Sequence, residues 1–190
     1  MENKEIEIQV NIEKSKALEE FLKENAEFVG GKSQKDDYFS PPHRDFTEIR
    51  PIKEWLRIRE SGDKAYINYK NWHYNEAGKS YFCDEYETEI QNVQQVKKIL
   101  ETLDFNHLVT VDKKRRVWRY KEYEVALDSV EGLGDFVEIE YKGESDVDPQ
   151  QETEKMIRFL KERGCGKIKR NYVGYPFQLL FPKEVKYEEL

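Results

Sequence analysis

The chain has 190 residues, of which 37% are charged and 13% aromatic, and its formal net charge is −7 at pH 7. This length predicts a single domain over residues 1–190, and the aromatic content argues against disorder. The acidic balance excludes the basic footprint of duplex nucleic-acid binding, whereas a small acidic ligand fits if the cations gather in one cleft.

Neither a membrane segment nor a metal-thiolate site is expected. No apolar run approaches the ~20 residues of a membrane-spanning helix, and the charged start does not resemble a signal peptide. Cys83 and Cys165 are far apart in sequence, and the three histidines are scattered, so zinc-ligand spacing is absent. These features predict a cytoplasmic protein with free thiols, no membrane partner and no nucleic-acid partner.

The first fifty residues predict a strand, a helix and a long loop. Residues 4–12 alternate polar and apolar side chains, which is typical of a strand. Residues 15–26 carry apolar side chains at helical spacing, with Ser15 as the N-cap. The glycine pair at 30–31 predicts a turn, and a loop is expected over about 41–51.

The middle of the chain predicts four strands and one helix. A hairpin turn at 61–63 joins the first two strands, and residues 92–104 form an amphipathic helix. The strands cover about 53–60, 64–72, 81–91 and 107–119. Their short connections favour a largely antiparallel sheet.

The last third predicts two strands followed by helices. The strands cover about 123–130 and 135–142. A helix begins at Asp148-Pro149, an N-cap followed by proline, and ends at Gly164. The aromatic tail over 171–181 is expected to be a short packing helix interrupted near proline. In total, about eight strands and three or four helices predict an α+β fold that is mainly β.

Charged side chains alternate along most of the predicted strands. Glu5 and Glu7 share one face of the first strand, as Glu138 and Glu140 do near the end. For one isolated strand, a solvated face is the simpler interpretation. Taken together, eight strands with a charged face could close into a barrel whose apolar faces pack outward against helices. Charges inside such a barrel must pair or bind a ligand.

A mixed interior of this kind suits a divalent metal bound to a polyphosphate. Carboxylates would hold the metal, and cations would hold the phosphate oxygens. Hard oxygen ligands without a Cys or His site favour Mg²⁺ or Mn²⁺. The cations on the strand faces are Arg57, Arg59, Lys70, Lys113 and Arg115. The register of residues 113–116 is open by one residue, and such a slip would reverse which cations face inward.

These motifs resemble the CYTH domain of the triphosphate tunnel metalloenzymes. The resemblance rests on the Glu5-x-Glu7 strand, the segment 55–59, the pairs Glu87-x-Glu89 and Lys113-x-Arg115, and the block 127–140. It covers about residues 4–180 and is closest to the class IV adenylate cyclase-like branch. It implies an eight-stranded antiparallel tunnel with helices packed outside and a triphosphate within.

The resemblance also implies roles for the charged residues. Glu5, Glu7, Glu138 and Glu140 would be catalytic metal ligands, with Glu87, Glu89 and Asp128 as further candidates. The five cations named above would clamp the triphosphate. The family signature has a lysine where this chain has Gln9, which offers no cation. Family members are often dimers, so a homodimer is a candidate assembly.

Three functions fit this inventory. A cyclase would convert ATP to cyclic AMP and pyrophosphate, which the closest motifs favour. A triphosphatase would hydrolyse tripolyphosphate or an organic triphosphate. A non-catalytic module would bind nucleotide or polyphosphate without turnover, which the amide at Gln9 makes an alternative. Phosphoryl transfer needs positioning and charge stabilisation more than a nucleophilic side chain, so the inventory does not separate the two reactions.

Overall fold

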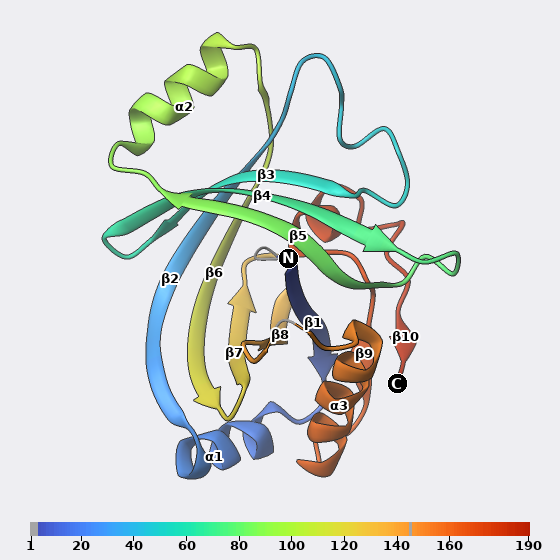
Figure 1. The fold of residues 1–190 in the computed structure, drawn as a ribbon. Helices are drawn as coiled ribbons and strands as arrows, with labels where there is room; N and C mark the ends of the chain where they lie inside the picture. Colours follow the sequence, from blue (N-terminus) through green and yellow to red (C-terminus); the bar gives the residue numbers. More distant parts are fainter. Residues whose placement is uncertain (1–3, 145) are drawn as a thin grey trace.

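A computed structural model describes residues 4–144 and 146–190, which form ten strands and four helices. Figure 1 shows strongly curved strands surrounding a central space, with the helices outside them. The strands are β1 Lys4–Ile12, β2 Glu27–Ser40, β3 Glu54–Ser61, β4 Lys64–Tyr74, β5 Ser80–Glu89, β6 Asn106–Tyr120, β7 Tyr123–Val130, β8 Gly134–Tyr141, β9 Ile168–Arg170 and β10 Glu188–Glu189. The helices are α1 Ser15–Asn25, α2 Val93–Thr102, α3 Pro149–Glu162 and α4 Tyr175–Leu180.

Eight of the described strands close into an antiparallel barrel. The order around the barrel is β1-β5-β4-β3-β2-β6-β7-β8, and β8 pairs back onto β1. The closing ladder runs from Ile6 opposite Tyr141 to Val10 opposite Val137. β9 and β10 extend the sheet outside the barrel from the far end of β1. The predicted eight-stranded tunnel is therefore confirmed.

The predicted turn at the glycine pair is wrong, because both glycines lie inside the 14-residue strand β2. The pairing of β2 with β6 shifts register between Phe28 and Gly30, so Val29 is the extra residue of a bulge. Gly30 has a φ of 152°, which side-chain-bearing residues rarely adopt. The glycines thus bend a long strand instead of ending it.

Some of the predicted helix ends are confirmed and others are wrong. The Asp148 side chain accepts a hydrogen bond from the Gln151 backbone N–H at 2.8 Å, as the capping signal predicts. Ser15 is the first residue of α1 and not its cap. Pro176 stands in the first turn of α4 and helps to begin that helix, so the predicted interruption there is wrong. The two short strands β9 and β10 were not predicted from the sequence pattern.

The apolar core lies outside the barrel wall, as expected. Ile8 of β1 and Ile139 of β8 point outward and are fully buried under the apolar faces of α1 and α3. Met156 and Leu160 supply the α3 side of this contact. Burial of this layer stabilises the barrel by ~25 cal/mol per Å² of apolar surface, and it leaves the polar strand faces to the interior.

A second apolar cluster covers one end of the barrel. Trp55 of β3 and Phe136 of β8 pack there against Tyr175 and Phe177 of α4. The C-terminal segment therefore covers the end of the tunnel at which β1 finishes. The opposite end, where β1 begins, faces the viewer in Figure 1. In the described ranges, no helix is long and apolar enough to cross a membrane.

Candidate active site

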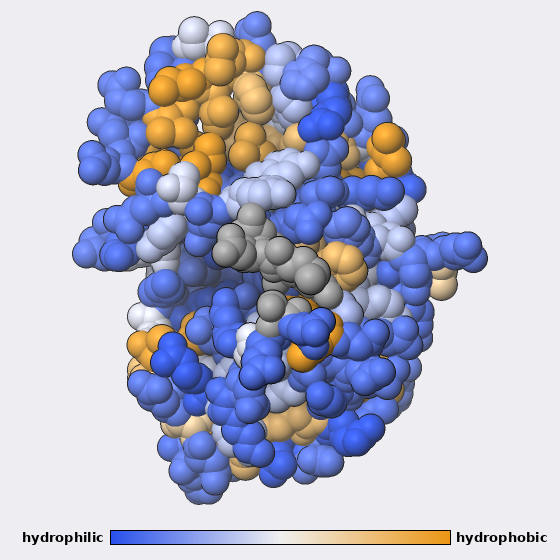
Figure 2. Space-filling view, viewed as in Figure 1, coloured by the Kyte–Doolittle hydropathy of each residue, from blue (hydrophilic) through white to orange (hydrophobic). Residues whose placement is uncertain are grey.

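A cavity of ≈ 360 Å³ occupies the barrel interior. Figure 2 shows its entrance as a hydrophilic hollow near the centre of one face of the molecule. Ten of the predicted site residues line it: Glu5, Glu7, Arg57, Arg59, Lys70, Glu87, Lys113, Arg115, Glu138 and Glu140. Strand alternation explains this convergence, because every second residue of each barrel strand points inward. For the register left open by the sequence, Lys113 and Arg115 face the cavity, while Arg116 lies outside and pairs with Glu19 on α1.

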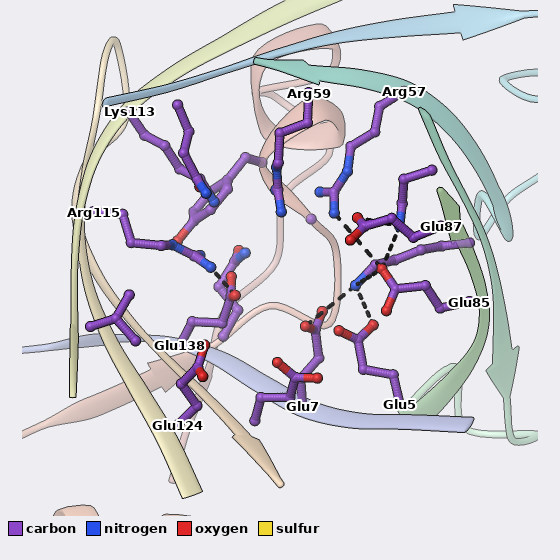
Figure 3. Close-up of a pocket in the computed structure, with 18 of the residues that line it drawn as sticks. Glu5, Glu7, Arg57, Arg59, Glu85, Glu87, Lys113, Arg115, Glu124 and Glu138 are labelled. Carbon is purple, nitrogen blue, oxygen red and sulfur yellow. Dashed lines mark hydrogen bonds and ion pairs between the residues drawn. The ribbon is translucent and has the colours of Figure 1, made fainter. Parts of the chain in front are cut away.

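Glu5 and Glu7 share a single cation. The Lys70 ammonium contacts Glu5 directly and lies 3.5 Å from Glu7 Oε2 and 3.6 Å from Glu85 Oε1. One positive charge therefore serves three buried or half-buried carboxylates. The Cys83 thiol lies 3.2 Å from Glu5 Oε2 as a further neutral neighbour. This side of the cavity carries an excess of negative charge (Figure 3).

That excess raises the proton affinity of the two carboxylates. Burial, only partly offset by Lys70, raises the pKa of Glu5 to about 7. Burial and then the neighbouring Glu5 raise the pKa of Glu7 to about 8. Burial also raises the pKa of Glu140. A bound divalent cation would relieve the repulsion and favour the ionised forms.

Two arginines across the cavity are held by buried aspartates. Arg59 donates from Nε and Nη2 to Asp36, both at 2.8 Å. Arg115 donates in the same way to Asp128, at 2.7 and 2.6 Å. Burial opposes ionisation of Asp36, but Arg59 and Arg57 hold its pKa far below the usual range. These bidentate pairs fix each guanidinium and, among the described residues, leave Nη1 without a hydrogen bond.

Two further cations are held more loosely. The Arg57 guanidinium lies 3.4 Å from Asp36 and 3.9 Å from Glu85, and its buried Nε has no hydrogen-bond partner among the described residues. The Lys113 ammonium lies 3.4 Å from Asp128, and its side chain is 2% exposed. Burial, with Arg115 beside it, lowers the pKa of Lys113 to about 8. Both cations retain hydrogen-bonding capacity for an anionic ligand.

Glu138 joins the two sides of the cavity. Its Oε1 lies 2.7 Å from Arg115 Nη2. Burial opposes ionisation, yet Arg115 and Lys113 hold the Glu138 pKa well below its usual range. Glu138 is therefore ionised at neutral pH and ready to accept a cation, unlike Glu7.

The structure places two predicted metal ligands away from the cavity. Glu89 is exposed and lies 3.6 Å from Lys64 on the neighbouring strand. Asp128 is 2% exposed, and both its oxygens accept from Arg115 while the Tyr175 hydroxyl donates to Oδ2 at 3.0 Å. Asp128 orients a cation and has little capacity left for a metal.

Several site residues escaped the sequence reasoning. Glu85 lies on the inward face of β5, two residues before Glu87, and accepts from Asn68 at 2.5 Å. Strand alternation alone could have identified it. Asp36 lies on β2, whose strand character was hidden by the assumed glycine turn. Tyr175 comes from α4, and only the folded chain brings it to the barrel.

The donor set fits a hard divalent cation, although the metal site is not preformed. In the part of the chain that the structure describes, no three Asp, Glu, His or Cys side chains are arranged to hold one ion. Lys70 lies between Glu5 and Glu7 and provides the positive charge there. The chemistry of the donors, all carboxylate oxygens with raised proton affinity on β1, matches Mg²⁺ or Mn²⁺, which often take their remaining ligands from water and phosphate.

The two ends of the cavity differ in chemistry. Where β1 begins, the lining includes Val29, Gly30 and Val117 beside Glu124 and Lys142. The apolar members form part of the entrance, and Val29 is 48% exposed. At the other end, Trp55, Trp72 and Tyr175 line the cavity under the C-terminal segment. A ligand therefore meets an apolar edge at the entrance and charge farther in.

Comparison with known proteins gives consistent matches. The CYTH domain model matches residues 3–171. The protein named "Putative adenylate cyclase MJ0240" of Methanocaldococcus jannaschii is 32% identical over 174 residues, which is 89% of this chain and 96% of that protein. The solved PH1819 protein of Pyrococcus horikoshii OT3 is 29% identical with a TM-score of 0.77, covering 95% of this chain and 99% of its own.

A more distant solved structure shows the same fold. It is HpAC1 from Hippeastrum, which is described as an adenylyl cyclase candidate with a dominant triphosphatase activity. It is 22% identical with a TM-score of 0.67, and the match covers 96% of this chain and all of that one. At this identity the likeness concerns the fold alone.

Proposed function

Because the chain belongs to the CYTH domain family, we propose that it is a divalent-metal-dependent enzyme that acts on a triphosphate inside the barrel. The observation that carries this proposal is the division of the cavity wall. Glu5 and Glu7 of β1 face Arg57 and Arg59 of β3 across the cavity (Figure 3). A metal triphosphate needs both kinds of wall, because its cation seeks carboxylates and its phosphate oxygens seek guanidinium and ammonium groups.

The carboxylates would hold the metal. Glu5, Glu7, Glu138 and Glu140 would be the principal ligands of Mg²⁺ or Mn²⁺, with Glu87 as a further candidate. The bound ion would neutralise phosphate charge and act as a Lewis acid. Neither Glu89 nor Asp128 belongs to this proposed set, since they do not line the cavity.

The cations would clamp the phosphates. The buried aspartates fix Arg59 and Arg115, and among the described residues each keeps Nη1 without a hydrogen bond, so both can bind phosphate oxygens without losing their orientation. Arg57 and Lys113 are less tightly paired and can turn to the ligand. Lys70 would exchange Glu5 and Glu7 for a phosphate oxygen once the metal binds those carboxylates. This arrangement is electrostatic preorganisation, which is the main demand of phosphoryl transfer.

We favour ATP as substrate, with cyclic AMP and pyrophosphate as products. In this reaction the ribose 3′-hydroxyl attacks the α-phosphorus and pyrophosphate leaves. Support comes from the entrance, where Val29, Gly30 and Val117 offer an apolar edge suited to a nucleobase. The name of the Methanocaldococcus relative points the same way.

Hydrolysis of a triphosphate is the second candidate. The observation in its favour is that the charged section of the cavity is complete without the apolar entrance. Tripolyphosphate would use only the carboxylates and cations, with water in place of the ribose hydroxyl as the nucleophile. The two candidates thus share the metal and phosphate residues and differ in their need for the entrance.

Phosphorus-31 NMR distinguishes the candidates. Purified protein with Mg²⁺ or Mn²⁺ is given ATP and tripolyphosphate in separate tubes. Cyclic AMP with pyrophosphate establishes the cyclase, and orthophosphate without a cyclic product establishes the triphosphatase. Glu138→Ala should abolish either reaction, while the matched Glu131→Ala, in an exposed turn, should leave it unchanged. Shifted phosphate lines without any new product line would instead indicate a binding module. Turnover that survives Glu138→Ala would refute the proposed site.

A further inference from the structure

The barrel has a seam between β1 and β5. Within the described residues, these strands pair only at Lys4 and Glu5, and the later part of β1 pairs instead with β9. A small cavity of ≈ 40 Å³ lies beside this gap. Glu7, Gln9 and Trp72 line both this cavity and the main one, so the two adjoin. A volume of about 40 Å³ holds a phosphoryl oxygen or a few waters, but no larger ligand.

Arg170 is a buried cation that lines this small cavity. Its residue is 3% exposed, and its Nη2 donates to the Ser80 carbonyl oxygen at 3.0 Å. Its guanidinium carbon lies 4.3 Å from the centre of the Tyr172 ring. Among the described residues, no carboxylate lies within 4.0 Å, and the buried Nη1 has no hydrogen-bond partner.

The other buried cations of the described chain provide a contrast. Arg57, Lys70 and Lys113 each have a carboxylate within 3.5 Å. An unpaired buried guanidinium is costly, because burial removes its hydration without replacing it. That burial lowers the pKa of Arg170, and the more distant charges of Glu188 and Glu7 offset this only in part. An anionic group of a bound ligand would compensate this buried charge.

The location indicates which part of a ligand that would be. Arg170 and Gln9 lie toward the end of the tunnel covered by the C-terminal segment, where Gln178 of α4 donates to the Gln9 side-chain oxygen at 3.1 Å. A triphosphate whose organic group remains at the open entrance would direct its last phosphoryl group to this end. Gln9 supplies no charge there, and Arg170 is the cation among the residues that line the small cavity.

We propose that Arg170 binds the terminal phosphoryl group of the triphosphate and thereby distinguishes a triphosphate from a diphosphate. This inference rests on the proposed function, since it assigns one end of the same ligand. It differs from a purely structural role, in which Arg170 would only bridge β5 and β9 through Ser80 and support Tyr172. A structural role would affect all ligands alike.

The test compares the affinities of two nucleotides. Dissociation constants are measured by calorimetry with Mg²⁺ and the α,β-methylene analogues of ATP and ADP, whose carbon bridge prevents cyclisation. Arg170→Met should weaken the ATP analogue at least tenfold and the ADP analogue less than twofold. Adding Gln9→Lys to Arg170→Met should restore at least a third of the lost ATP preference, because it returns a cation to the same end. Arg116→Met, which removes an outward arginine of β6, is the matched control and should change neither constant.

The outcomes separate the two proposals. If the wild type binds neither analogue nor tripolyphosphate, the proposed function fails. If the wild type binds and Arg170→Met weakens both analogues equally, or neither, the role of Arg170 is overturned while the proposed function stands. If Arg170→Met does not fold, Arg170→Lys decides, since it keeps the charge but loses the planar fork. It should lower the ATP preference at least threefold, and an unchanged preference would overturn the inference.

Discussion

Two groups of buried carboxylates in the same barrel behave in opposite ways. Asp36 and Asp128, here called the paired carboxylates, each hold an arginine by two hydrogen bonds of 2.6–2.8 Å. Glu5 and Glu7, the open carboxylates, share Lys70 with Glu85 and have raised pKa values. The paired side chains are at most 1% exposed and the open ones 9–13% exposed, so greater burial does not explain the raised pKa values of the open group, and the difference comes from the partners. The paired carboxylates orient the arginines of the site, and the open carboxylates are available to bind a cation.

The largest expected effect follows from breaking a paired carboxylate. Asp36→Ala removes the nearest carboxylate from the buried Arg57 and the half-buried Arg59, which should reduce the free energy of unfolding by about 3–5 kcal/mol. Urea denaturation monitored by tryptophan fluorescence measures this change. Asp112→Ala, on the exposed face of β6, is the matched control and should cost less than about 0.5 kcal/mol. Equal losses in the two variants would remove the distinction between the groups.

Removing an open carboxylate should act in the reverse direction on stability. Glu7→Gln takes away a charge that repels Glu5, so the metal-free protein at pH 8 should gain about 1 kcal/mol. The same change should reduce metal-dependent turnover by about a hundredfold or more, because it removes a proposed metal ligand. Denaturation and initial-rate measurements on one preparation test both halves. A loss of stability with unchanged turnover would contradict the comparison.

The pH dependence of metal-free stability should sharpen the contrast. The folded protein holds protons on Glu5 and Glu7 up to about pH 7 and 8, whereas the unfolded chain releases them near 4.5. Unfolding therefore releases protons, and stability should fall on the order of 2 kcal/mol as pH rises from about 4.5 to 8. Thermal melts across this range in EDTA measure the fall.

Metal provides the control for that measurement. Mg²⁺ binds the ionised carboxylates, so it should stabilise the protein more at pH 8 than at pH 5.5. The double variant Glu5→Gln with Glu7→Gln should show a flatter pH profile and little response to Mg²⁺. A wild-type profile that rises with pH in EDTA would show that the open carboxylates are not protonated in the folded state.

The smallest effect is expected at Glu89, which the sequence pattern also offered as a metal ligand. Its ion pair with Lys64 is exposed, with both side chains at 57%. Glu89→Gln should change stability by less than about 0.5 kcal/mol and turnover by less than twofold. Activity assays of Glu89→Gln and Glu87→Gln compare two residues of β5, of which only Glu87 faces the cavity. A large loss of turnover in Glu89→Gln would mean that the ligand site extends along β5 beyond the cavity described here.

Much of the fold could be predicted because alternation reports directly on a strand face. Glu5 with Glu7, Arg57 with Arg59, and Lys113 with Arg115 each fall two residues apart, and the structure places all six on one interior surface. The N-cap at Asp148 and the helix after it are equally local signals, and they are confirmed. The glycine pair misled, because a bulge inside a long strand and a turn between two strands use the same residues.

Local pattern determined which residues could share a face, since side-chain direction along a strand depends only on the backbone period. Tertiary structure decided which charges are already neutralised. Asp128 and Glu138 are both acidic residues on neighbouring strands, yet one is enclosed by Arg115 and Tyr175 while the other borders the cavity. The same holds for Arg170, which has no carboxylate within 4.0 Å in the part of the chain that the structure describes, a feature visible only once β1, β5 and β9 are assembled. Pairing and burial depend on contacts between residues distant in sequence, and these contacts set whether a charge supports the fold or binds a ligand.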